Sequence, residues 1–102
     1  MLDIVTLTDR SVKAKEKIQV YISGALHGNE RVGPHACFYF IELLLSNFNR
    51  DPYLTNLLKT REIILTPMTN APGFDRNERK EPMGGVATKY QSIDINRDFP
   101  YN

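Results

Sequence analysis

The stretch IQVYISGALHGNE, residues 18–30, decides the fold, because a short apolar run ends there in polar, glycine-containing residues. β-Branched and aromatic side chains dominate the run and two glycines bracket its exit, so we predict a buried strand followed by a turn. Open α/β sheets place their sites beyond the carboxyl ends of their strands. We therefore expect functional side chains at residues 27–30.

His27 and Glu30 stand three residues apart on this turn. An imidazole nitrogen and a carboxylate with this spacing can converge on one ion, and a His/His/Glu set is one known combination for catalytic zinc. The pattern has a second interpretation, in which Glu30 caps the following helix and complements its dipole. The two interpretations stay open on these residues alone.

Length and composition indicate an ordinary globular chain of at most one domain. The 102 residues are 41% hydrophobic and 25% charged with a net charge of +1, which gives no bias toward nucleic acid or an acidic partner. No apolar run is long enough for a membrane, and the first residues lack the layout of a signal peptide. The location stays open on these residues, with the cytoplasm slightly favoured. The single cysteine, Cys37, is expected to be a small core residue. The oligomeric state is not indicated.

Two further strands are predicted. Alternating apolar and polar residues predict one over 2–8, which we expect to lie beside the strand that begins at Ile18. The polar segment 9–17 between them is expected to be a solvated hairpin or loop. The run EIILTPM, residues 62–68, predicts a strand parallel to the Ile18 strand, because a helical crossover connects the two.

Two helices are predicted in the crossover. Apolar residues at helical spacing and a proline suited to a first turn predict a helix over Pro34–Asn47. A shorter helix is predicted over Pro52–Lys59. His35, near the start of the first helix, is expected to be a surface or capping histidine and not a ligand. The fold class is thus α/β, with a partial mixed or parallel sheet and helices.

The chain after the third predicted strand is rich in turns and charge. Residues 69–74, TNAPGF, should turn at the same sheet edge as His27. Residues 75–91 form a long polar stretch, and loops of this length are usually functional or disordered. Near the end, Asn96 and Arg97 place an amide beside a planar guanidinium, which suits the bidentate grip of a carboxylate. A surface arginine beside a turn asparagine is the alternative.

Three motifs together resemble those of the zinc metallocarboxypeptidases of the A/B and N/E-like groups. They are HGNE, a strand followed by PM-x-N-x-x-GF, and DINRDFP, in the order and with the spacing of that family. The resemblance covers nearly the whole chain and implies a slice of an α/β/α carboxypeptidase-like domain. Ala71 and Pro72 in the second motif and Asp98 in the third depart from the commoner NPDG and NRNF, which indicates a divergent branch.

The resemblance also implies roles for individual residues. His27 and Glu30 correspond to two of the three zinc ligands, and Asn96 with Arg97 to the pair that binds the terminal carboxylate of a peptide substrate. An arginine of the preceding loop polarises the scissile carbonyl in this family. Arg79 matches it best, with Arg76 as the alternative.

The implied function is zinc-dependent hydrolysis of C-terminal peptide bonds. The family's third zinc ligand, substrate-covering tyrosine and glutamate base lie beyond residue 102, and relatives begin earlier. We therefore expect residues 1–102 to be an internal part of a roughly threefold larger catalytic domain, inactive alone. The sequence does not indicate which C-terminal residue is released.

Two other functions remain open. Deacylases of the aspartoacylase and succinylglutamate desuccinylase type also carry HGNE and Asp-x-Asn-Arg-x-Phe, but act on small N-acyl amino acids; the Gly73-Phe74 turn and Pro100 favour the peptidase. A non-catalytic module could keep the carboxylate grip without turnover. A longer reading frame with a downstream histidine and glutamate would indicate the enzyme.

Overall fold

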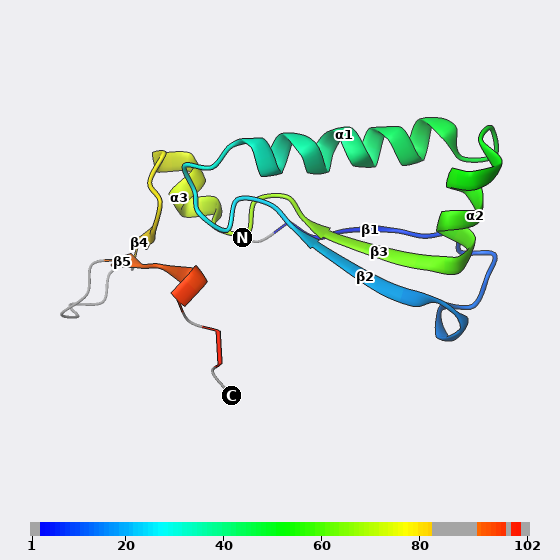
Figure 1. Ribbon diagram of the computed structural model, residues 1–102, viewed down its shortest axis with the longest axis horizontal. Helices are drawn as coiled ribbons and strands as arrows, with labels where there is room; N and C mark the ends of the chain where they lie inside the picture. Colours follow the sequence, from blue (N-terminus) through cyan, green and yellow to red (C-terminus); the bar gives the residue numbers. More distant parts are fainter. Residues whose placement is uncertain (1–2, 83–91, 98, 101–102) are drawn as a thin grey trace.

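The computed structural model describes residues 3–82, 92–97 and 99–100. A three-stranded sheet carries two helices, and a smaller hairpin-like unit follows at one end (Figure 1). The α/β class predicted from the sequence is confirmed. The elements in order are β1 (Val5–Leu7), η1 (Ala14–Glu16), β2 (Ile18–Ser23), α1 (Val32–Asn47), α2 (Pro52–Thr60), β3 (Arg61–Thr66), α3 (Ala71–Arg76), β4 (Glu81–Pro82), β5 (Ser92–Ile93) and η2 (Ile95–Arg97).

The sheet has the strand order β1-β3-β2. β2 runs parallel to β3, from Ile18 opposite Arg61 to Ser23 opposite Thr66, as the helical crossover predicts. β1 pairs antiparallel with β3 and not with β2, so the predicted neighbourhood of the first strand and the Ile18 strand is wrong. The connection between β1 and β2 is therefore a loop and not a hairpin.

The central position of β3 explains this order. Ile63 and Leu65 of β3 are buried, strands pair with both edges of β3, and the loop from β1 crosses over its start. Lys17 stabilises the loop where it crosses the start of β3. Its buried Nζ donates to Thr8 Oγ1 at 2.6 Å and to the backbone carbonyls of Asp9 and Leu58.

β2 is an edge strand, and its predicted burial is wrong. The side chains of Ile18 and Tyr21 are each 61% exposed. Only β3 pairs with β2 in the part of the chain that the structure describes, so its outer edge and one face lack cover. The apolar composition of the run therefore predicted a strand correctly but did not indicate whether its side chains are buried.

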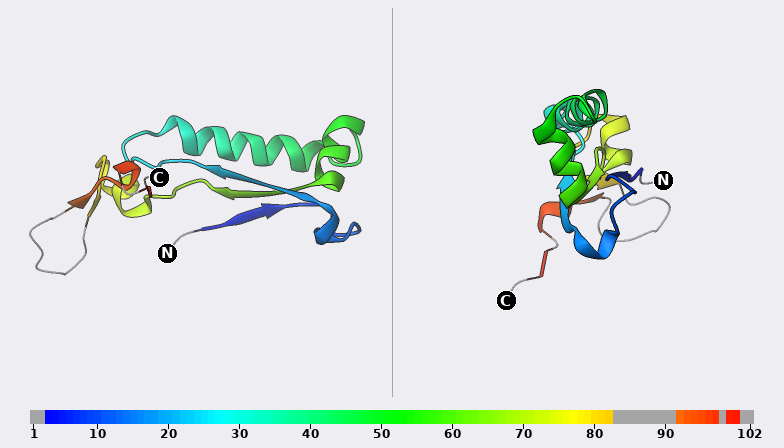
Figure 2. Two further views of the ribbon diagram at one scale, coloured as in Figure 1. Left: turned by 60° about the horizontal axis from the view of Figure 1, so that its bottom comes forward. Right: turned by 90° about the vertical axis from the view of Figure 1, so that its right-hand side faces the viewer.

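The helices cover one face of the sheet. α1 lies along the strands and α2 stands at the end where β3 begins (Figures 1 and 2). α2 begins at a cap in which Asp51 accepts from the Leu54 amide at 2.8 Å, with Pro52 in its first turn. Both helices agree with their predicted ranges to within two residues. The core between helices and sheet consists of Leu7, Cys37, Leu44, Leu58, Ile63 and Leu65.

Cys37 occupies the predicted core position. Burial raises the pKa of its thiol, as expected of a packed and unreactive cysteine. None of the helices in the described ranges is long and apolar enough to span a bilayer.

The end of the molecule opposite α2 contains α3, β4, β5 and η2 (Figure 1). The turn predicted at 69–74 is in part the short helix α3, capped by the side chain of Asn70, which accepts from the Gly73 amide at 2.9 Å. β4 pairs antiparallel with β5. The predicted long loop at 75–91 therefore contains structure up to residue 82, and its residues from 83 on lie outside the described ranges.

Candidate metal centre

The exits of β2 and β3 meet at one edge of the sheet, as predicted. Gly24 donates its amide to the Thr66 carbonyl at 2.9 Å and accepts at its own carbonyl from the Thr69 amide at 3.0 Å. The Asn70 amide donates to the Ala25 carbonyl at 3.0 Å. These main-chain bonds join the two turns that carry the candidate side chains.

Ala25 holds the turn before His27 in an uncommon conformation. Its φ of 44° lies in the left-handed region, which side chains with a Cβ adopt at a cost of about 1 to 2 kcal/mol. The bond from Asn70 and the burial of Ala25 fix this conformation. The chain thereby turns back, and His27 lies inward with only 5% of its surface exposed.

The two nitrogens of His27 face two different carboxylates. Nδ1 lies 3.0 Å from Glu30 Oε1, and Nε2 lies 3.0 Å from Asp94 Oδ1. An imidazole donates to both carboxylates only if both nitrogens carry a proton. A cation bound by Nδ1 and Oε1 removes this requirement, because the Nε2 proton alone then serves Asp94. The donor set and its arrangement thus fit a zinc ion held by His27 and Glu30.

Glu30 takes part in this cluster and does not cap α1. Its Oε1 also accepts from Arg79 Nη1 at 3.1 Å, and α1 begins after Arg31 without a side-chain cap bond from that residue. The capping interpretation of the sequence is therefore not supported.

Arg79 is the arginine that reaches the cluster. Its Nε lies 3.6 Å from Asp94 Oδ2, and its backbone carbonyl accepts from the Gly28 amide at 3.1 Å and from Asn70 Nδ2 at 3.3 Å. Arg76 lies in the last turn of α3 with an exposed side chain. The contacts favour Arg79 over Arg76.

Asn96 and Arg97 lie on η2, directly after Asp94. The backbone amide of Asn96 donates to Asp94 Oδ1 at 3.1 Å, and the backbone amide of Arg97 donates to the Asp94 carbonyl at 2.9 Å. Both residues are exposed. One short turn thus carries the predicted carboxylate-binding pair and the carboxylate that contacts His27. Asp98 of the same motif lies outside the described residues.

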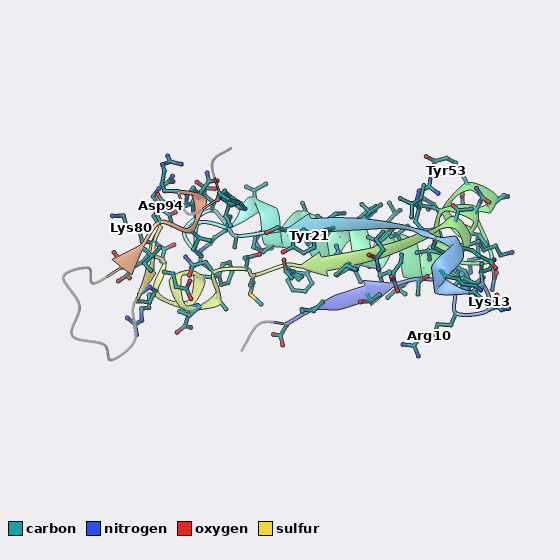
Figure 3. All side chains as sticks on the ribbon, turned by 90° about the horizontal axis from the view of Figure 1, so that it is seen from below. Arg10, Lys13, Tyr21, Tyr53, Lys80 and Asp94 are labelled. Atoms are coloured by element: carbon teal, nitrogen blue, oxygen red, sulfur yellow. The ribbon has the colours of Figure 1, made fainter. Side chains whose placement is uncertain are left out.

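The charge state of Asp94 follows from its neighbours. Its partial burial alone would raise its pKa, but the hydrogen bonds from His27 and from the Asn96 amide and the nearby positive charge of Arg79 outweigh that effect and lower the pKa below its usual value. Asp94 is therefore an anion at neutral pH. Figure 3 shows it at the end of the molecule opposite Arg10 and Lys13.

Sequence reasoning missed two residues of this site. Asp94 stands two residues before Asn96, and the known pairing of metal-binding histidines with carboxylates could have indicated it. Asn70 is fully buried and connects the exit of β3 to Arg79, which no local pattern reveals. In the described ranges, no three His, Cys, Asp or Glu side chains are placed to hold one ion.

The fold and these motifs define an α/β domain with a candidate metal centre at a strand exit. The sequence profile of the zinc carboxypeptidase family matches residues 1–102, so the chain belongs to that family. Mouse carboxypeptidase D is 35% identical over 78 residues, which are 76% of this chain and 6% of that protein. Carboxypeptidase E of Caenorhabditis elegans is 32% identical over 89 residues, covering 82% of this chain and 19% of that protein.

A solved structure has the same fold. The crystal structure of thrombin activatable fibrinolysis inhibitor superposes with a TM-score of 0.81 at 24% identity, over 96% of this chain and 25% of that one. The chain therefore spans a quarter or less of these similar proteins.

Proposed function

We propose that this chain provides part of the active site of a zinc-dependent carboxypeptidase, with His27 Nδ1 and Glu30 Oε1 as two zinc ligands. This proposal rests on the 3.0 Å distance between these two atoms and on the contact of Asp94 with the other nitrogen of the same ring. Family membership supports zinc as the ion. Further protein ligands and the proton-accepting base would come from outside the described residues.

Asn96 and Arg97 would bind the terminal carboxylate of a peptide. Both are exposed on η2, and Asp94 links that turn to His27. A guanidinium and an amide can hold both carboxylate oxygens by charge-assisted hydrogen bonds. Because only a chain end offers a carboxylate next to the scissile bond, this pair would restrict the enzyme to C-terminal residues.

Arg79 would act on the scissile carbonyl. A zinc ion held by His27 and Glu30 would supply a Lewis acid and an activated water. The Arg79 guanidinium lies within 3.1 Å of the Glu30 carboxylate, so it stands beside the same reaction centre. There it would donate to the oxygen on which negative charge develops. Asp94 would keep the His27 ring oriented with its proton on Nε2.

The test is an Arg97→Ala substitution in the full-length protein, assayed on peptides with a free and with an amidated C-terminus. Loss of the charge-assisted bond, worth about 1.5 to 3 kcal/mol, should reduce kcat/KM on free peptides about tenfold to a hundredfold. Amidated peptides should be poor substrates of the unchanged enzyme and lose much less.

Arg10→Ala is the matched control, because Arg10 lies at the far end of the molecule (Figure 3). It should leave both activities unchanged. Equal losses on free and amidated peptides for Arg97→Ala would contradict the carboxylate grip, and turnover only of small N-acyl amino acids would indicate a deacylase.

A further inference from the structure

Arg31 connects the turn that carries Glu30 to helix α3. Its Nη2 donates to the Phe74 carbonyl at 3.1 Å, and its Nε donates to Asn77 Oδ1 at 3.3 Å. The same guanidinium lies over the Phe74 ring, with 4.5 Å from Cζ to the ring centroid. One side chain thus makes two hydrogen bonds and a cation–π contact to residues 43 and 46 positions further along the chain.

These contacts hold the end of α3 in place, and the chain continues from there to Arg79. Asn77 ends α3 in the left-handed conformation, with φ of 56°, and the Glu78 amide closes the turn on the Gly73 carbonyl at 2.8 Å. The chain reverses there and reaches Arg79 two residues after Asn77. Arg31 therefore holds the turn that sets the direction of Arg79.

The other end of this connection is next to Glu30. Arg31 follows Glu30 in the chain and forms the N-cap of α1, so its backbone is fixed by a long helix. The two turns are also in direct contact, because a Cβ added at Gly28 would lie 2.4 Å from the Phe74 amide nitrogen. A shift of α3 would therefore alter the distance between Arg79 and Glu30.

We infer that Arg31 is a positioning residue, which clamps α3 to the metal-ligand turn so that the Arg79 guanidinium stands beside Glu30. This inference rests on the proposed function of Arg79. The clamp needs the planar fork of an arginine, because one group must donate in two directions while it stacks on Phe74. A lysine at this position would supply the charge without that geometry.

The experiment combines Arg31→Met, Arg31→Lys and Arg79→Ala in the full-length zinc-loaded protein, with kcat and KM measured on a peptide with a free C-terminus. Arg31→Met should lower kcat about threefold to tenfold with little change in KM, since Arg79 would be misplaced and the carboxylate grip would not. Arg31→Lys should restore little of this loss. In an Arg79→Ala background, Arg31→Met should have no further effect.

Arg10→Met is the matched control and should leave kcat unchanged. An Arg31→Met loss that persists in full in the Arg79→Ala background would overturn the inference, because Arg31 would then act independently of Arg79. If Arg79→Ala itself leaves kcat unchanged, the proposed function fails first, and the two failures are distinguishable.

A crystal structure of the zinc-loaded Arg31→Met protein tests the clamp without turnover. We expect the Arg79 guanidinium to move by about 1 Å or more from its place in the unchanged protein, or to lose its order. An Arg79 side chain in its original place would overturn the inference whatever the kinetics show.

Discussion

Asp94 Oδ1 lies 3.0 Å from the Nε2 atom of His27, although the two residues are 67 positions apart in the chain. In the proposed site, the carboxylate accepts a hydrogen bond from Nε2–H, so that Nδ1, which faces Glu30, would be the nitrogen that binds a metal. Asp94 lies between β5 and η2, and its carboxylate contacts both His27 and Arg79.

Removal of the Asp94 carboxylate should weaken zinc binding. In the full-length protein, Asp94→Ala should raise the dissociation constant for zinc about tenfold to a hundredfold, because the His27 ring loses its orientation and its fixed proton position. Competition with a chromophoric chelator measures this affinity. Asp75→Ala, which changes an exposed carboxylate of α3, is the control. Equal affinities for both variants and the unchanged protein would show that Asp94 does not support the metal.

Gly28 is required by the close approach of two main-chain segments. A Cβ at this position would lie 2.1 Å from the Gly73 carbonyl carbon and 2.4 Å from the Glu78 carbonyl oxygen, and neither atom belongs to a flexible side chain. Gly28→Ala should therefore separate the turns and lower the free energy of unfolding by about 1 to 3 kcal/mol. Denaturant unfolding of the full-length protein measures the change.

Gly33→Ala provides the control for this substitution. Its Cβ would meet Ala25 N at 3.3 Å, and alanine is favoured over glycine in the helix α1. Its effect on stability should be small. If Gly28→Ala is as well tolerated as Gly33→Ala, the two turns do not pack as described.

Lys17 should contribute to stability through its buried ammonium group. Lys17→Met keeps most of the apolar stem but leaves the Thr8 hydroxyl and two backbone carbonyls without this donor. We expect a loss of about 1 to 3 kcal/mol in the free energy of unfolding. The exposed Lys15 gives the control, since Lys15→Met should change stability by less than about 0.5 kcal/mol. Similar effects of both substitutions would argue against a role for Lys17 in the crossing over β3.

The local patterns predicted most of the elements, because each depends on residues close in sequence. Helical spacing and Pro34 indicated α1, and the crossover made β2 and β3 parallel, so that the turns at Ala25 and Asn70 meet at one sheet edge. The pairing of β1 with β3 depends instead on which strand takes the centre of the sheet. That choice is tertiary, and the alternation in residues 2–8 contains no information on it.

The candidate site was predictable to a similar extent. The motifs indicated His27, Glu30 and Arg79, whose side chains the structure brings together. Arg31 contacts residues more than 40 positions away, which no short pattern encodes. Arg31 could be recognised only after the turns were placed against each other, whereas a carboxylate partner of His27 could have been sought in the sequence.

The zinc content of the full-length protein tests the central claim most directly. Metal analysis after extensive dialysis should find about one zinc per chain in the unchanged protein, as expected for a catalytic site with several protein ligands. His27→Ala and Glu30→Ala should each retain little zinc, whereas His35→Ala, which removes an exposed imidazole from α1, should retain all of it. Full zinc content in folded His27→Ala and Glu30→Ala proteins would contradict the assignment of this turn as the metal centre.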